Sequence, residues 1–153
     1  MRIATAGSPR VGGRADLESL AGTLRAIGAP LWPRGRTVTV ALVGERRMAS
    51  LNRRYKGRSG AAEILTFPCG DGPGPAAETP LGEICLCWAS LVRGARGRGV
   101  SRRAYAARLV AHGLLHLAGH RHSTAAEERR MERAERRLLR GHLGAREIER
   151  LFA

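Results

Sequence analysis

One stretch of the chain constrains its fold more than any other: residues 109–119 (LVAHGLLHLAG) contain no Asp, Glu, Lys or Arg. A helix that is apolar on every side is stable only when it is buried, so we expect a central helix around which the other elements pack. The stretch includes His112 and His116. A spacing of four residues is about 40° around an α-helix, so both imidazoles leave the same face, one turn apart.

Two imidazoles on one helical face indicate a metal site. This is the geometry with which a helix offers two nitrogens to one Zn²⁺ at about 2.0–2.1 Å. Gly119 can adopt the left-handed conformation that ends a helix, and His122, three residues later, can turn back as a third ligand. His120 is the alternative third ligand, but it follows the glycine too closely to reach back easily. Because each unpaired buried polar group costs about 1–3 kcal/mol, metal binding accounts for the cluster better than burial as ordinary core residues does.

The complete spacing is H-x-x-x-H-x-x-G-x-x-H, which matches the zinc signature of the metzincin proteases. One position differs: metzincins carry a Glu, the general base, directly after the first His, whereas this chain has Gly113. The sequence therefore predicts one Zn²⁺ per chain on His112, His116 and His122, with a fourth position open to water. The protease interpretation lacks its base.

The hydrophobic pattern predicts a few strands followed by a run of helices. The expected strands are 37–43, 63–67 and 81–87, and the expected helices are 16–27, 45–55, 88–98, 102–118, 125–140 and 145–151. Residues 69–80 are rich in Gly and Pro and are expected to be a loop that joins the two strands of a hairpin. This order predicts an α+β fold. We expect a single domain over 1–153, with a small mixed β-sheet packed by helices and the three-His zinc site on the buried central helix.

The charge of the chain indicates a polyanionic partner. The 27 Lys+Arg residues outnumber the 13 Asp+Glu residues, which gives a formal charge of +14. A GC-rich genome explains why Lys56 is the only lysine, but it does not explain the excess of cations over acids, so we expect contact with nucleic acid. The candidate contacts form two basic stretches: Arg53, Arg54, Lys56 and Arg58, and then Arg93, Arg96, Arg98, Arg102 and Arg103.

A third basic stretch has a different interpretation. Between residues 127 and 140, arginines alternate with Glu127, Glu128, Glu132 and Glu135, a pattern typical of a solvated helix with i,i+4 ion pairs. His142 follows in the same charged region and is expected at the surface. Aromatic residues make up only 4% of the chain, which disfavours binding that depends mainly on base stacking.

The sequence predicts a cytoplasmic protein with no membrane partner. No apolar run approaches the roughly 20 residues of a membrane span, and the first residues lack the apolar region of a signal peptide. The three cysteines, Cys69, Cys85 and Cys87, do not make a disulfide framework, and we expect Cys85 and Cys87 to be buried and unreactive. The oligomeric state is not predicted.

The histidine motif resembles that of the YbeY family of bacterial endoribonucleases. The family pattern H-G-x-L-H-L-x-G-x-x-H is met between His112 and His122, and residues 51–55, 63–68 and 81–84 resemble further family motifs in the same order. The resemblance implies a single α+β domain, one Zn²⁺ on three histidines, and a metal-dependent endoribonuclease specific for single-stranded RNA. It also implies a role in maturation of the 16S ribosomal RNA 3′ end and in ribosome quality control.

Several positions depart from the family pattern. The family has Arg after the motif Tyr and Lys two residues further on, whereas here these are Lys56 and Arg58. The resemblance implies that one of these two cations neutralises charge on the phosphorane. Arg121 replaces an Asp before the third His, which removes a carboxylate that would orient a ligand. Ala61, Ala62 and Glu63 replace Pro-Thr-Asp, so we expect an altered substrate groove.

The favoured hypothesis is a zinc-dependent phosphodiester hydrolase that acts on single-stranded RNA. The metal would lower the pKa of its bound water to about 7 and polarise the phosphoryl oxygen. Either the zinc hydroxide or the 2′-hydroxyl of the RNA can be the nucleophile, and the sequence does not choose between them. A minimal zinc metalloprotease and a non-catalytic, zinc-stabilised ribosomal-RNA-binding factor are the alternatives. The charge favours the first and third hypotheses over the second.

Overall fold

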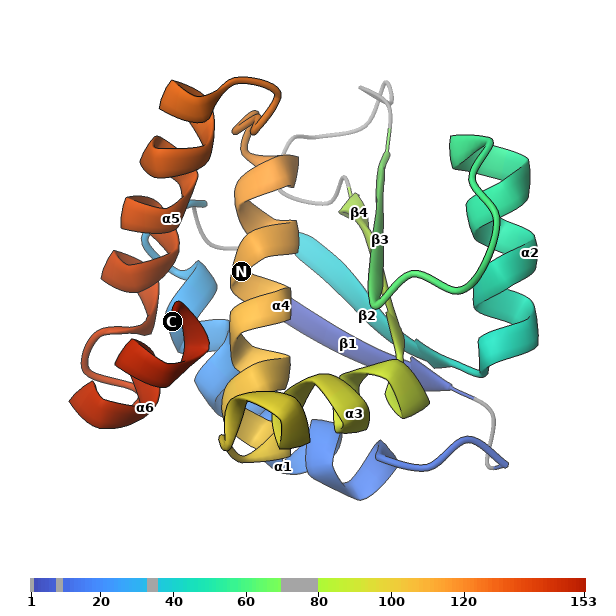
Figure 1. Cartoon of the computed structure of the whole chain (residues 1–153), viewed down its shortest axis with the longest axis horizontal. Helices are drawn as coiled ribbons and strands as arrows, with labels where there is room; N and C mark the ends of the chain where they lie inside the picture. Colours follow the sequence, from blue (N-terminus) through green and yellow to red (C-terminus); the bar gives the residue numbers. More distant parts are fainter. Residues whose placement is uncertain (1, 8–9, 33–35, 70–79) are drawn as a thin grey trace.

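A four-stranded mixed sheet runs through the middle of the molecule, in the order β1-β2-β4-β3 (Figure 1). The computed structural model describes residues 2–7, 10–32, 36–69 and 80–153. The strands are β1 (Arg2–Gly7), β2 (Thr37–Val43), β3 (Ile64–Pro68) and β4 (Pro80–Cys87). β1, β2 and β4 are parallel, and β3 pairs with β4 in the antiparallel sense. The predicted mixed sheet and the predicted hairpin of β3 and β4 are both confirmed.

Six helices surround the sheet in the described part of the chain. They are α1 (Arg14–Gly28), α2 (Glu45–Lys56), α3 (Trp88–Arg98), α4 (Arg102–Leu117), α5 (Ala125–Leu139) and α6 (Ala145–Leu151). Helix α4 lies between the sheet and α5, while α2 lies on the opposite side of the sheet (Figure 1). The α+β fold class is therefore confirmed. None of these helices, as far as the chain is described, has both the length and the apolar character that crossing a bilayer requires.

Side-chain alternation along the inner strands produces two separate hydrophobic clusters. In β2, Val38, Val40 and Leu42 belong to a large cluster with α1, α3, α4, α5 and α6. Ala41 and Val43, which alternate with them, belong to a small cluster with Met48 of α2 and Leu65 of β3. The inner strands β2 and β4 are thus buried on both faces, but most of the core lies on the α4 side.

The cysteines of β4 lie in the small cluster, as expected. Cys85 and Cys87 are both buried. Burial and the neighbouring Glu83 carboxylate raise the pKa of Cys85 to about 12. A thiol with such a pKa is protonated at neutral pH and is a poor nucleophile or metal ligand.

Strand β1 is the one element of the described chain that the sequence pattern does not predict. Only Ile3 in this strand packs on the core, and the other side chains are exposed. The strand is held by its parallel ladder to β2 and by a hydrogen bond from the Arg2 N–H to the Arg36 carbonyl oxygen. Backbone pairing at a sheet edge leaves no hydrophobic alternation to detect. The predicted loop at residues 69–80 lies mostly outside the described residues, and β4 already begins at Pro80.

Helix α4 is buried along most of its length, as the uncharged stretch predicts. Ser101 caps its N-terminus, where its side chain accepts a hydrogen bond from the Ala104 N–H at 3.1 Å. At the far end, the helix packs on β4 beside Gly82. A Cβ atom at Gly82 would lie 2.4 Å from the Phe67 carbonyl oxygen and 2.7 Å from Leu117 Cδ2. The close approach of α4 to the sheet therefore requires glycine at this position.

Replacing Gly82 by alanine is expected to lower the free energy of unfolding by about 1–3 kcal/mol, as over-packing of a core does, because the Phe67 backbone cannot move away easily. The matched control is Gly97→Ala in α3, where a Cβ would meet nothing within 4 Å. That change should stabilise the protein by up to about 1 kcal/mol through helix propensity. Urea unfolding of both variants checks the prediction, and equal stabilities would contradict it.

Candidate metal centre and its pocket

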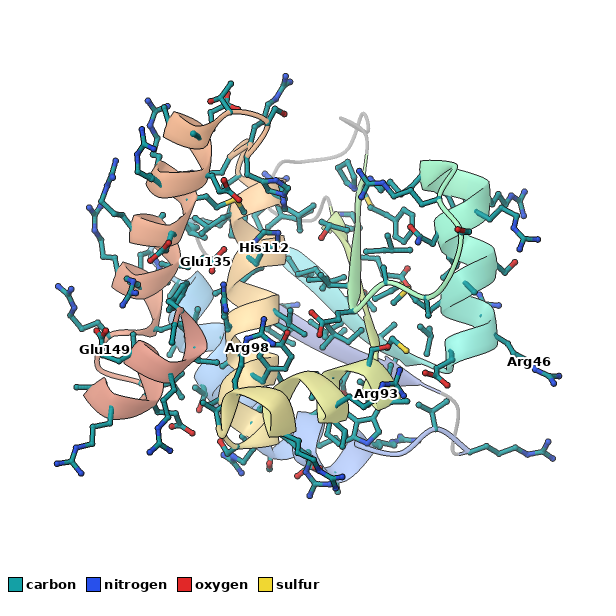
Figure 2. All side chains as sticks on the ribbon, viewed as in Figure 1. Arg46, Arg93, Arg98, His112, Glu135 and Glu149 are labelled. Carbon is teal, nitrogen blue, oxygen red and sulfur yellow. The ribbon has the colours of Figure 1, made fainter. Side chains whose placement is uncertain are left out.

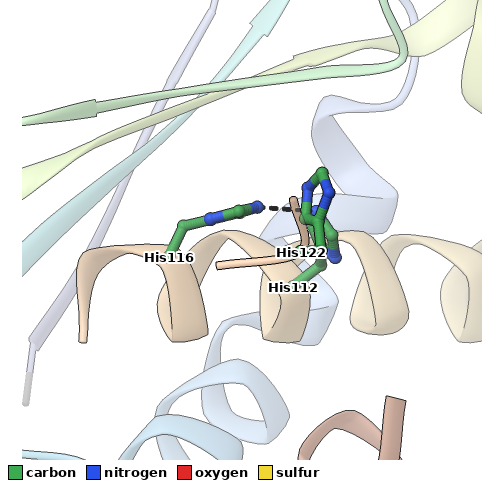
Figure 3. A group of neighbouring side chains, drawn as sticks. All are labelled: His112, His116 and His122. Atoms are coloured by element: carbon green, nitrogen blue, oxygen red, sulfur yellow. Dashed lines mark hydrogen bonds between the residues drawn. The ribbon is translucent and has the colours of Figure 1, made fainter. Parts of the chain in front are cut away.

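Three imidazoles meet at the C-terminal end of α4 (Figure 3). His112 and His116 lie on the last two turns of the helix, and His122 lies in the segment that follows it. The Nε2 atoms of His112 and His116 are 3.0 Å apart. One nitrogen from each of the three rings falls within 4.8 Å of the others, so the three side chains can hold a metal ion.

Hydrogen bonds at the outer ring nitrogens define which nitrogens face inward. His112 Nδ1 lies 2.6 Å from Oε1 of Glu135, and His116 Nδ1 lies 3.0 Å from the carbonyl oxygen of His120. A carboxylate and a carbonyl can only accept, so both Nδ1 atoms must be the donors. Both Nε2 atoms then carry lone pairs when the rings are neutral. This is the arrangement that metal-binding histidines usually have.

The two inward-facing lone pairs make this donor set suitable for a cation. Two unprotonated nitrogens 3.0 Å apart repel one another unless a positive charge lies between them. Their separation is close to the roughly 3.3 Å expected for two nitrogens bound tetrahedrally at about 2.0–2.1 Å from Zn²⁺. Burial, and then the neighbouring His112 and His122, lower the pKa of His116 to about 4. His116 therefore keeps its lone pair available well below neutral pH.

The turn after α4 brings His122 rather than His120 to the other two histidines. Gly119 has a φ of +93°, which only glycine adopts easily. The His120 N–H then bonds to the carbonyl oxygen of Leu115 at 2.9 Å, which closes the helix. The ring centroid of His122 comes within 4.8 Å of that of His116. His120 contributes its backbone carbonyl to His116 but no ring nitrogen to the group.

An open pocket of about 730 Å³ contains the three histidines. Lys56 and Arg58 also line it, and they come from the end of α2 and the loop after it, across β3 from α4 (Figure 1). Gly57, with a φ of +64°, ends α2 between these two cations. The buried Asn52 donates from Nδ2 to the carbonyl oxygen of Gly60 at 2.9 Å, and so holds this loop against the helix. The predicted metal ligands and the two predicted catalytic cations therefore share one pocket.

Glu135 is the site residue that the sequence interpretation missed. Instead of lying on a solvated face, it is only 4% exposed, and it contacts both His112 and Arg108. Its position in a buried stripe with Met131 and Leu139, at intervals of four residues, is the signal that could have identified it. Arg121 stands where the family pattern has an Asp next to His122. In this chain a carboxylate contacts a different histidine, His112, and it comes from α5.

The remaining predicted RNA contacts lie in two places. Arg53 and Arg54 are exposed on α2, on the same helix as Lys56. The second basic stretch lies on α3 and the first turn of α4, at the opposite end of α4 from the histidines (Figure 1). Several of its members already have partners within the chain. Arg93 forms an ion pair with Glu45, and Arg102 forms one with Asp16 at 3.8 Å. Arg103 donates to the Ser19 hydroxyl at 2.8 Å, and the Arg98 guanidinium lies over the Tyr105 ring. Arg96 is exposed on the last turn of α3.

Comparison with known proteins identifies the family. The profile of the family described as "Endoribonuclease YbeY" matches residues 21–142. The chain belongs to the YbeY family. Proteins named endoribonuclease YbeY from Azoarcus sp. (strain BH72), Halorhodospira halophila and Alkalilimnicola ehrlichii are 46%, 39% and 36% identical to it, over 68%, 69% and 84% of the chain. The matches cover 42%, 70% and 80% of those relatives, so the match spans less than half the length of the Azoarcus protein.

A solved structure shares the fold of this chain. The solution structure of a Thermotoga maritima protein superimposes with a TM-score of 0.57, over 90% of this chain and 89% of that one, at 25% sequence identity. The shared architecture covers more of the chain than residues 21–142, the segment that the YbeY profile matches.

The glycine of the YbeY motif after the first histidine has a structural cause in this chain. A Cβ atom at Gly113 would lie 2.9 Å from Ile84 Cδ1 and 3.1 Å from Thr66 Oγ1. Gly113 therefore faces the sheet at close range, beside Ile84 and the pocket-lining Thr66, and a larger residue would require these side chains to shift. Glycine brings no carboxylate to the position where metzincins carry their general base, which argues against the protease alternative.

The position of the third imidazole leads to a test of the ligand set. His122→Ala should weaken zinc binding by more than about 100-fold, because even an outer hydrogen-bond partner of a ligand contributes about 10–100-fold. His120→Ala should leave binding nearly unchanged, since the residue supplies only its carbonyl. Zinc per chain, measured on protein purified without a metal-affinity tag, should be close to one for the wild type and for His120→Ala. Loss of zinc from His120→Ala but not from His122→Ala would contradict this assignment.

Proposed function

We propose that the chain, as one domain over residues 1–153, is a zinc-dependent endoribonuclease that cleaves single-stranded RNA. Its proposed role is maturation of the 16S ribosomal RNA 3′ end and ribosome quality control, with the ribosome as partner, in the cytoplasm. The observation that carries the proposal is the pocket in which the three imidazoles meet the cationic side chains of Lys56 and Arg58, with Arg121 also in its lining. Membership of a family whose members are named endoribonucleases supports the reaction class.

The proposed ligands are the Nε2 atoms of His112 and His116 and one ring nitrogen of His122. The Nδ1 hydrogen bonds of the first two hold their rings in the required tautomer. When bound, Zn²⁺ supplies Lewis acidity toward a phosphoryl oxygen and lowers the pKa of a water molecule to about 7. Three protein ligands leave room for that water, as in other catalytic zinc sites.

Lys56 and Arg58 are the proposed electrostatic groups of the reaction. Cations fixed beside a phosphoryl group stabilise the negative charge that develops during its substitution. Among the described residues that line the pocket there is no Asp or Glu, so the pocket attracts a polyanion and contains no carboxylate base. In the proposed reaction the nucleophile is the water molecule or the 2′-hydroxyl of the RNA, activated without a carboxylate of the chain.

A comparison of substrates on the full-length, zinc-loaded chain tests this function. We expect cleavage of single-stranded RNA, little cleavage of the same sequence as a duplex, no cleavage of casein, and loss of RNA cleavage after chelation. Re-addition of zinc should restore the activity. Cleavage of casein would favour the metalloprotease alternative, and tight RNA binding without cleavage would favour the non-catalytic binding factor.

The position of the basic residues predicts how RNA binding depends on salt. On a single strand, each neutralised phosphate contributes about −0.7 to the slope of log K against log salt. Arg58 lines the pocket, and Arg53 and Arg54 are exposed on the helix that carries Lys56. Reversing all three to Glu should therefore flatten the slope by about 2 if each contacts one phosphate. Reversal of Arg129, Arg133 and Arg137, which lie on the exposed face of α5, is the matched control and should change it less. Equal changes would show that the charge acts diffusely.

A further inference from the structure

A buried carboxylate connects the proposed metal site to the C-terminal part of the fold. Glu135 on α5 points toward His112 on α4 (Figure 2), and its Oε1 lies 2.6 Å from His112 Nδ1. Its second oxygen, Oε2, lies 3.3 Å from Arg108 Nε. Arg108 is one turn before His112 on α4, so both residues face α5. One carboxylate therefore contacts an arginine and a histidine of the same helix through separate oxygens.

The arginine is itself held by the end of the chain. Arg108 donates a hydrogen bond from Nη1 to the carbonyl oxygen of Leu151. Its guanidinium carbon lies 4.1 Å from the ring centroid of Phe152, a distance at which a cation is attracted to an aromatic face. Leu151 is fully buried, so this anchor is part of the core. The C-terminal segment therefore holds the Arg108 guanidinium through atoms other than Nε, the atom that lies next to Glu135.

The surroundings of Glu135 exclude the ordinary alternative that it is a surface acid with an incidental contact. With 4% of the residue exposed, water cannot replace either partner, and a buried carboxylate without partners would be strongly destabilising. Its contact with His112 differs in kind from that of His116, whose Nδ1 donates to a neutral carbonyl. A negatively charged acceptor makes the imidazole a stronger electron-pair donor at Nε2. His112 therefore has a support that the other histidine of α4 lacks.

We propose that Glu135 is a positioning residue that orients His112 and raises the affinity of the three-His site for Zn²⁺, and that Arg108 and the segment Leu151–Phe152 hold Glu135 in place. The inference rests on the zinc site of the proposed function, but it does not depend on RNA cleavage. None of these four residues lines the pocket, so the inference assigns a role in the site to side chains that lie behind it.

Zinc binding by the full-length chain tests the proposal, with Zn²⁺ alone as the probe and a chromophoric chelator as the competitor. Glu135→Gln keeps the size of the side chain but removes the charge, and it should weaken zinc binding about 10–100-fold. Glu132→Gln is the matched control, because Glu132 is on the same helix but pairs with Arg136 on the surface. The zinc affinity of this variant should stay within about twofold of the wild-type value. Zinc affinity of Glu135→Gln equal to that of the control would overturn the proposal.

A measurement on the wild type covers the case in which Glu135→Gln does not fold. In ¹⁵N-labelled, zinc-loaded protein, the Nδ1 proton of His112 should give a slowly exchanging resonance, because it is buried against a carboxylate. A protonated Nε2 with an unprotonated Nδ1 at His112, or a wild-type chain that binds no zinc, would overturn the proposal. A chain that binds zinc, shows the Nδ1 proton and loses affinity in Glu135→Gln, but does not cleave RNA, would support this inference and refute the proposed nuclease.

Discussion

Burial of α4 is the constraint on which the rest of the structure depends. The helix has the sheet on one side and α5 on the other, and its second half, after Arg108, contains no Asp, Glu, Lys or Arg, so its stability requires both neighbours. The glycines at 82 and 113 let the helix and the sheet approach closely. Of this helix, only the last two turns, with His112 and His116, line the pocket.

The polar groups of the site are satisfied almost entirely by elements that α4 itself positions. The helix end supplies the His120 carbonyl to His116, and the helix packed beside it supplies the Glu135 carboxylate to His112. No buried side-chain polar atom of the described residues lacks a hydrogen-bond partner. An imidazole whose outer nitrogen is already bonded has a single orientation, so the site is preorganised before any ion arrives.

Much of this arrangement could be predicted from the sequence, because it depends on local patterns. The helical spacing of two histidines, the glycine that ends the helix and the caps at Ser101 and Thr124 are all detectable within a few residues. The four-residue stripe with Met131 and Leu139 marks Glu135 as buried, but local pattern cannot connect it to the histidines, because its partners lie 23 and 27 residues away. Strand β1 was missed for a related reason, since its stability comes from backbone pairing with β2 rather than from its own side chains.

The division of the core into two clusters has a consequence for motion. The histidine side of the pocket rests on the large cluster, whereas the helix that carries Lys56 rests on the small one behind the sheet. The free energy that opposes local unfolding grows with the apolar surface that an element buries. Helix α2 should therefore detach from the sheet at lower cost than α4, and its amide protons should exchange with solvent sooner. The pocket thus has a rigid side that carries the imidazoles and a more mobile side that carries Lys56. Its width can therefore vary while the three histidines keep their positions relative to one another.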